Sequence, residues 1–142
     1  MDDDLAQRAR RIKDIEAKQR HLKLVHGWIG HYVPERDEDK PGRNFHTHGF
    51  DETWGHPDFQ ITMPLEPTVA HALFWILARR VKKGEKFETG IPYEGILGSG
   101  FITKFVEAKE DDRIVLRMLI PDKDGRLPGD DGCASAFEEN QQ

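Results

Sequence analysis

One run of helical periodicity, residues 67–83, constrains the fold of this chain more than any other feature of its sequence. Pro67 suits the first turn of a helix, and Gly84 stands just past the last residue, where glycine commonly ends helices. The apolar residues between them recur at the spacing of one broad helical face. They are Val69, Ala70, Leu73, Phe74, Ile76, Leu77 and Val81. We therefore predict a core helix that buries this face against other elements.

Short segments of strand character surround the predicted helix. Five runs show aromatic and β-branched enrichment or apolar–polar alternation: residues 28–33, 45–50, 58–63, 101–106 and 113–120. The alternation in residues 58–63 predicts a half-buried strand, and the acidic turn at residues 110–112 predicts an antiparallel hairpin. Residues 34–44 are charged and bracketed by proline, which indicates an exposed loop. We predict an α+β fold with a mixed, largely antiparallel sheet of about four to five strands packed on one main helix.

A second helix is predicted at the N-terminal end, over residues 2–23. The segment lacks glycine and proline, and Leu5, Ile12, Ile15 and Leu22 follow one another at helical spacing. We therefore divide the chain into an N-terminal amphipathic helix (1–25), a single α+β domain (26–133) and a polar tail (134–142).

Charge and cysteine usage narrow the class of protein. The formal net charge is −5, with a basic excess before residue 26 and an acidic excess after residue 106. This balance argues against general nucleic-acid binding and is compatible with a homo-oligomer. The single cysteine, Cys133, cannot form an internal disulfide, and no apolar run is long enough to span a bilayer. We expect a soluble cytoplasmic protein with no membrane association.

Histidines provide the first candidate site. His46 and His48 stand two apart in a predicted strand, so both side chains project from one face, and His56 follows in the next turn. Imidazoles at His-x-His spacing can approach one divalent ion such as zinc, with His56 or a carboxylate as a third ligand. A bound water could then act as a hydrolytic nucleophile. The alternative is an ordinary exposed strand, and no cofactor is assured.

Aromatic residues suggest another use for the same face. Imidazoles donate hydrogen bonds to anions, and Trp28 or Trp54 could wall a pocket for a small anionic or nucleotide-like molecule. On the core helix, His71, Trp75 and Arg79 recur every four residues and form a strip suited to a ligand rim. Packing in the core is the competing interpretation for each aromatic residue.

Several motifs in this order resemble a bacterial family of unknown function, the domain-of-unknown-function family 4262. The matching motifs are His26-Gly27-Trp28, Thr47-His48-Gly49, Gly55-His56-Pro57-Asp58, Ala70-His71 and the run Pro121-Asp122-Lys123-Asp124-Gly125-Arg126. The resemblance covers about residues 26–133 and implies an α+β domain, with no reaction, cofactor or catalytic residue. The family more often has tyrosine and valine where this chain has His46 and His48, so chemistry at these histidines need not be shared.

Three functions remain open on this evidence, and whether the chain is an enzyme stays uncertain. The preferred hypothesis is a non-enzymatic binder of a small anionic or nucleotide-like ligand, with contacts from His46, His48, Trp28, Trp54, His71 and Arg79. The second is a metal-dependent hydrolase that uses His46, His48 and His56. The third is a protein-interaction module in which the basic N-terminal helix and the acidic C-terminal third bind a partner.

Overall fold

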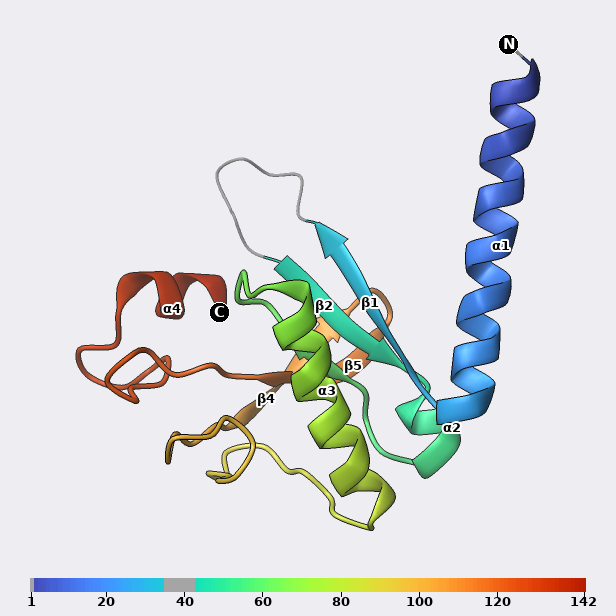
Figure 1. The fold of residues 1–142 in the computed structure, drawn as a ribbon. Coiled ribbons are helices and arrows are strands. Elements are labelled where there is room, and N and C mark those ends of the chain that lie inside the picture. The colour runs from blue at the N-terminus through green and yellow to red at the C-terminus, as the bar shows by residue number, and fades with distance from the viewer. Residues whose placement is uncertain (1, 35–42) are drawn as a thin grey trace.

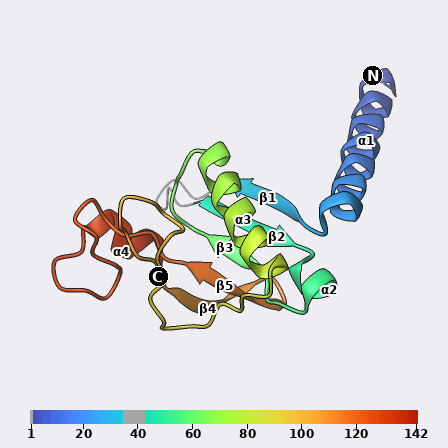
Figure 2. The ribbon, with the colours of Figure 1, turned by 60° about the horizontal axis from the view of Figure 1, so that its bottom comes forward.

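The computed structural model describes residues 2–34 and 43–142, and it confirms an α+β fold with a mixed sheet. Five strands form one sheet in the order β1-β2-β3-β5-β4 (Figure 1; β3 is labelled in Figure 2). Their bounds are Ile29–Pro34 (β1), Arg43–His48 (β2), Phe59–Ile61 (β3), Phe105–Glu110 (β4) and Arg113–Met118 (β5). The helices are Asp2–His26 (α1), Phe50–Trp54 (α2), Pro67–Lys82 (α3) and Ser135–Asn140 (α4).

The sheet consists of two antiparallel hairpins joined through its shortest strand. β1 pairs with β2, and β4 pairs with β5, in both cases antiparallel. Between them, β3 pairs antiparallel with β2 and parallel with β5. The parallel pairing requires a long crossover, and α3 lies within that connection.

Helix α3 lies across one face of the sheet and closes the core (Figure 2). Most of its predicted apolar face is buried, and Ala70 and Leu77 have no exposed surface, but Val69 in the first turn is 48% exposed. Phenylalanines supply much of the remaining volume, and their rings meet mostly edge to face or tilted. These residues are Phe45, Phe50, Phe59, Phe74, Phe87 and Phe105.

Two strand bounds and the burial of one strand differ clearly from the sequence prediction. The second strand ends at His48, because Gly49 turns the chain at a φ of 112° and Phe50 begins α2. The segment predicted as half-buried is buried throughout β3, Gln60 included, because strands pair with it on both sides. The strand predicted at residues 101–106 begins only at Phe105 and runs on to Glu110. The predicted exposed loop at 34–44 falls largely on residues 35–42, outside the described part of the chain.

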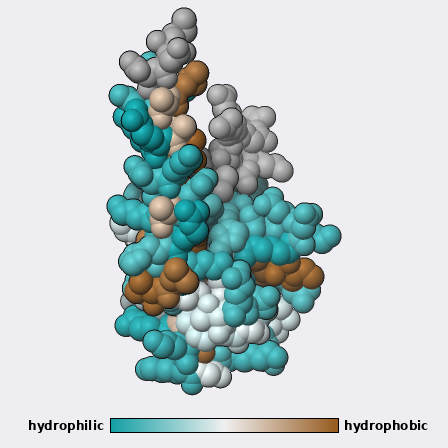
Figure 3. Space-filling view, turned by 90° about the vertical axis from the view of Figure 1, so that its right-hand side faces the viewer, coloured by the Kyte–Doolittle hydropathy of each residue, from teal (hydrophilic) through white to brown (hydrophobic). Residues whose placement is uncertain are grey.

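Helix α1 extends away from the sheet and contacts it only near its C-terminal end (Figure 1). Lys23 forms an ion pair with Glu52 of α2, with 2.9 Å between Nζ and Oε1. The Thr53 hydroxyl donates a hydrogen bond of 2.6 Å to the carbonyl oxygen of Gly27, just after the helix. Along the helix, apolar side chains remain exposed (Figure 3), Ile12 and Ile15 each by 56%. Among the described residues, no helix has both the length and the apolar content needed to cross a bilayer.

The C-terminal segment is more ordered than a polar tail. α4 packs Phe137 against the core, and the Gln141 side chain is 2% exposed. In the motif that starts at Pro121, the Asp122 carboxylate accepts hydrogen bonds from the backbone N–H groups of Asp124, Arg126 and Ala134. Its oxygens therefore organise a turn.

Candidate functional site

Three histidines from the first hairpin form a compact cluster on the sheet. The β1–β2 register places His31 directly opposite His46, and His48 lies two residues further along β2 on the same face. One ring nitrogen from each of His31, His46 and His48 can be chosen so that the three atoms lie within 4.8 Å of one another. The rings meet edge to face, with centroids 4.8 to 5.4 Å apart. We call these three residues the histidine cluster.

The cluster lies on the face of the sheet opposite α3. Phe45 packs in the core below α3, and side chains alternate along a strand, so His46 and His48 point away from that helix. The register extends the polar row across the sheet, from His46 to Gln60 and from Gln60 to Arg117. Gln60 donates to the Asn44 side chain and accepts from Arg117, which satisfies a buried amide in the middle of the sheet.

Polar groups surround the cluster on several sides. His46 Nε2 lies 3.5 Å from Glu110 Oε1, and its Nδ1 lies 3.3 Å from Asn44 Oδ1. Gln19 reaches down from α1, and its Nε2 is 3.2 Å from His31 Nε2. His46 is almost fully buried, whereas His31 and His48 are half-buried. The cluster is therefore accessible through two of its three members.

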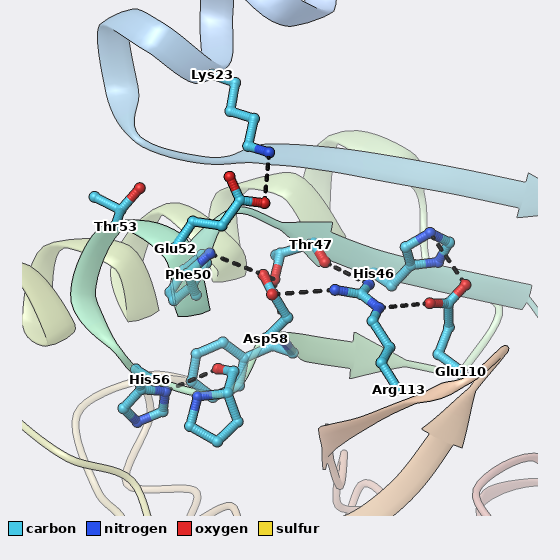
Figure 4. A network of polar contacts seen from close by, with 12 residues as sticks. Lys23, His46, Thr47, Phe50, Glu52, Thr53, His56, Asp58, Glu110 and Arg113 are labelled. Atoms are coloured by element: carbon cyan, nitrogen blue, oxygen red, sulfur yellow. Dashed lines mark hydrogen bonds and ion pairs between the residues drawn. The ribbon is translucent and has the colours of Figure 1, made fainter.

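An ion-pair network fixes the end of the sheet beside the cluster (Figure 4). Arg113 contacts Glu110 at 2.7 Å through Nε and Asp58 at 3.1 Å through Nη1, and its Nη2 donates to the Thr47 carbonyl oxygen. Asp58 Oδ1 accepts from the Thr47 hydroxyl and from the Phe50 backbone N–H. These contacts tie β2, α2 and the β4–β5 hairpin together and position Glu110 next to His46.

Electrostatics keep two of the histidines neutral near pH 7. Burial lowers the pKa of His46 to about 4, with Glu110 opposing the shift and His48 and Arg113 adding to it. Burial also lowers the pKa of His48, and the Arg113 charge lowers it further. For Glu110, burial raises the pKa, but the Arg113 hydrogen bond and His46 outweigh it, so the pKa is lowered overall. The site thus combines neutral imidazoles with an ionised carboxylate.

His56, the third ligand expected from the sequence, is not part of the cluster. Its Nδ1–H donates to the Pro57 carbonyl oxygen at 2.8 Å, and its Nε2 accepts from the Phe87 backbone N–H at 3.0 Å. Both ring nitrogens are therefore engaged in buried hydrogen bonds that join the turn after α2 to the segment after α3.

The aromatic residues expected to wall a pocket lie apart from the histidine cluster. Trp28 is buried and packs against Phe50, His71 and Trp75, beneath α3. Trp54 packs on Phe50 at the core edge, and Arg79 is exposed on α3. His71 is exposed, accepts from Trp75 Nε1–H at 3.0 Å, and borders an open hollow of about 410 Å³. The hollow lies between α3 and strands β1 and β2, where Tyr32 and Phe45 line it together with His31 of the histidine cluster.

Sequence patterns alone do not indicate a site at His31, Glu110, Arg113 or Gln19. His31 sits in a segment that was correctly predicted as a strand, so its face could have been compared with that of His46. Doing so needs the hairpin register, which depends on the length of the connecting turn. Glu110 follows His46 by 64 residues in the sequence, and Gln19 precedes it by 27. No local pattern points to such distant contacts.

Comparison with known proteins gives one match. A family model described as a domain of unknown function, DUF4262, matches residues 24–134. No curated protein and no solved structure matches the chain.

Proposed function

The chain belongs to the DUF4262 family, whose description names no activity, and from the geometry of its histidines we propose that it binds a divalent transition-metal ion such as zinc. The observation that carries the proposal is the histidine cluster, with ligand atoms of His31, His46 and His48 within 4.8 Å of one another. Imidazole nitrogens are common zinc ligands, and three protein ligands with an open fourth position are typical of catalytic zinc sites.

The protonation state of the cluster supports metal binding over anion binding. Imidazole binds a metal only when neutral, and burial lowers the pKa of both His46 and His48. Neutral imidazoles also lack the positive charge that would attract an anion. The two arginines nearby are already committed: Arg113 to Asp58 and Glu110, and Arg117 to Gln60 and the Gln141 carbonyl oxygen.

Groups around the cluster are of the kind that orient metal ligands. A ligating histidine commonly donates its second ring nitrogen to a carboxylate or carbonyl oxygen, which fixes the ring. Glu110 Oε1 and Asn44 Oδ1 are acceptors of this kind beside the ring of His46, whereas Gln19 donates its amide N–H to His31 Nε2. Arg113 in turn holds Glu110. In the structure both ring nitrogens of His46 lie beside oxygen acceptors, so a bound ion would have to replace one of these two contacts.

Hydrolysis is the reaction class that such a site would support. A bound zinc ion lowers the pKa of its water to about 7 and so supplies hydroxide at neutral pH. Glu110, ionised and beside His46, is the candidate group to accept a proton from that water.

Metal titration of the full chain tests the proposal. We expect untagged protein, stripped with a chelator and dialysed, to bind one zinc ion per chain in isothermal titration calorimetry. His31→Ala and His48→Ala should each weaken binding by at least about tenfold, whereas His21→Ala, a histidine exposed on α1, should leave it unchanged. Circular dichroism would confirm that the variants fold. Absence of stoichiometric binding, or equal binding by all three variants, would refute the metal site.

A second candidate is small-ligand binding in the hollow beside α3. The hollow has a volume of about 410 Å³, and His71 and Tyr32 give it polar and aromatic walls. These are features of small-molecule sites, and an anionic or nucleotide-like ligand remains the proposed class. Chemical-shift perturbation with AMP as the probe would test it. Shifts concentrated on residues that line the hollow, among them Gly30, Thr68 and His71, would support the proposal, and unchanged spectra at millimolar AMP would count against a nucleotide ligand.

A further inference from the structure

Helix α1 leaves a row of apolar side chains uncovered along most of its length. Leu5 is 67% exposed, Ile12 and Ile15 56% each, and Leu22 43%. Because helices gain most of their stability from packing an apolar face, a 25-residue helix with this exposure lacks a partner surface. In Figure 3 separate apolar patches lie along this upright helix, with hydrophilic surface between them.

The exposed residues follow the spacing of a coiled-coil contact. Leu5, Ile12, Ile15 and Leu22 are separated by seven, three and seven residues, which are a and d positions of a heptad. The same positions include two polar residues, Arg8 and Gln19. We call these six residues the α1 seam.

The two ends of the seam have different surroundings. Towards the C-terminus, Leu22 and Gln19 overhang the domain and line a hollow of about 140 Å³ together with Trp75. Towards the N-terminus, α1 extends past the edge of the domain (Figure 1), and Leu5 and Ile12 in this part of the helix are exposed. The seam therefore consists of four apolar residues interrupted by Arg8 and Gln19, with a hollow at its C-terminal end and a free apolar residue at its N-terminal end.

We propose that the α1 seam pairs with the α1 seam of a second copy of this chain in an antiparallel two-helix contact. The contact is isologous, so that residue i of one copy meets residue j of the other and j meets i. Over Leu5 to Leu22 it spans about 26 Å at a rise of 1.5 Å per residue. This proposal does not depend on metal binding.

The order of residues in the seam is complementary to its own reverse. In an antiparallel pair centred between residues 13 and 14, Leu5 meets the partner's Leu22, and Ile12 meets the partner's Ile15. The two polar residues also meet, Arg8 with the partner's Gln19. The Gln19 amide nitrogen is directed at His31, which leaves its amide oxygen to accept from arginine. A parallel pair would instead place Arg8 against the partner's Arg8, which costs free energy through charge repulsion.

Charge at the helix ends favours the same orientation. The helix begins with Asp2-Asp3-Asp4, and the basic residues of its last turn are Lys23 and His26. Antiparallel pairing brings Asp4 of one helix beside Lys23 of the other copy, which also contacts its own Glu52, and it aligns opposite ends of the two helix dipoles. The hollow at Leu22 and Trp75 then receives the partner's Leu5.

The oligomeric state of the full chain tests the proposal. Because the contact is small, we expect a monomer–dimer equilibrium in the micromolar range by sedimentation velocity. Ile12→Lys and Ile15→Lys should each give a monomer at every concentration up to 200 µM. Lysine has a helix propensity at least equal to that of isoleucine, so loss of the dimer would not reflect loss of the helix. Leu24→Lys, at a residue 85% exposed on the opposite side of α1, is the matched control and should remain dimeric.

Disulfide trapping tests the orientation. In a Cys133→Ser background, oxidised Leu5→Cys/Leu22→Cys should form a covalent dimer, because the two positions are too far apart within one helix to react with each other. Leu5→Cys alone should form no disulfide-linked dimer, because an antiparallel pair keeps the two copies of residue 5 apart. A covalent dimer of Leu5→Cys alone would indicate a parallel pair, and a wild-type chain that is monomeric at 200 µM would overturn the proposal.

Discussion

Arg113 binds Asp58 across the sheet, with 3.1 Å between Nη1 and Oδ2. The Asp58 side chain is 7% exposed and also accepts hydrogen bonds from Thr47 and Phe50, so its charge is compensated inside the fold. One carboxylate thereby holds the end of β2, the start of α2 and the β5 strand in register. The position of Glu110 next to His46 follows from this arrangement, because Arg113 also binds Glu110.

Replacement of Asp58 should destabilise the domain more than loss of a surface ion pair. We expect Asp58→Ala to lower the free energy of unfolding by about 3 kcal/mol, because the Arg113 charge and two donors lose their acceptor. Glu52→Ala, which removes the exposed pair with Lys23, should cost less than about 1 kcal/mol. Urea denaturation of both variants measures the difference. Equal effects would show that the Asp58 network does not stabilise the fold.

Gly49 should tolerate no side chain. Its φ is +112°, and a Cβ there would lie 2.6 Å from the Gly27 carbonyl oxygen. Gly49→Ala should therefore lower the free energy of unfolding by more than about 2 kcal/mol, since steric overlap adds to the left-handed backbone penalty. Gly84 has a similar φ of +101° and no atom within 4 Å, so Gly84→Ala should show only the backbone penalty of about 1 kcal/mol. If the two variants melt alike, the close approach of Gly49 to Gly27 is not rigid.

Acid should weaken the fold through His56. Burial is the main reason why the pKa of His56 is lowered from 6.5 in the folded state, although its hydrogen bond to Pro57 opposes the shift. As the pH falls, the unfolded chain therefore binds a proton at His56 before the folded chain does. The contribution of neutral His56 to the free energy of unfolding is complete above pH 6.5 and is lost as the pH falls below that value. His56→Gln should reduce the dependence of unfolding free energy on pH between 7.5 and 5.5, and His21→Gln should not. Identical slopes for wild type and His56→Gln would contradict the assignment.

Metal binding should raise the thermal stability of the protein. At a zinc concentration 100 times the dissociation constant, binding to the folded state alone adds about 2.7 kcal/mol to the free energy of unfolding. For a domain of this size we expect the melting temperature to rise by roughly 8 °C. Differential scanning calorimetry of His48→Ala should show no such rise, and a chelator should reverse it in the wild type. Stabilisation of His48→Ala to the same degree would place the metal elsewhere.

The last residues of the chain should contribute to stability. The Gln141 side chain donates to the Ile120 and Phe137 carbonyl oxygens and accepts from the Ile120 backbone N–H. Gln141→Ala should lower the free energy of unfolding by about 2 kcal/mol, because buried backbone groups lose their partners. Gln142→Ala, at an exposed neighbour, should have little effect. Chemical denaturation distinguishes the two, and equal stability would show that α4 is not fixed by Gln141.

Local periodicity predicted the main elements of this fold, and burial by neighbouring strands explains where it failed. The core helix is confirmed within one residue at its C-terminal end, because its apolar face and both end signals agree. β3 was predicted as half-buried from its alternation. Its polar Gln60 is nevertheless buried, because Asn44 and Arg117, from two other strands, satisfy the amide. Alternation alone cannot tell a polar residue in water from one paired inside a sheet.

The candidate site was predictable only where its residues lie in one strand. His46 and His48 share a face by strand geometry alone, and the structure places them together as expected. The third member was expected to be His56 from its closeness in sequence. The structure instead brings His31 opposite His46 through the hairpin register, while α2 and a turn carry His56 into buried backbone contacts. Proximity in sequence predicts contact only within one element.

The position of β3 has a consequence for how the chain folds. Each outer hairpin joins residues close in sequence and can form from local contacts alone. β3, only three residues long, must be joined to β5 after a connection of 51 residues that includes α3. Closing so long a connection is entropically costly, and little local structure in β3 offsets that cost. We therefore expect the two hairpins to form early and their union through β3 to limit the folding rate, with α3 docking in the same step.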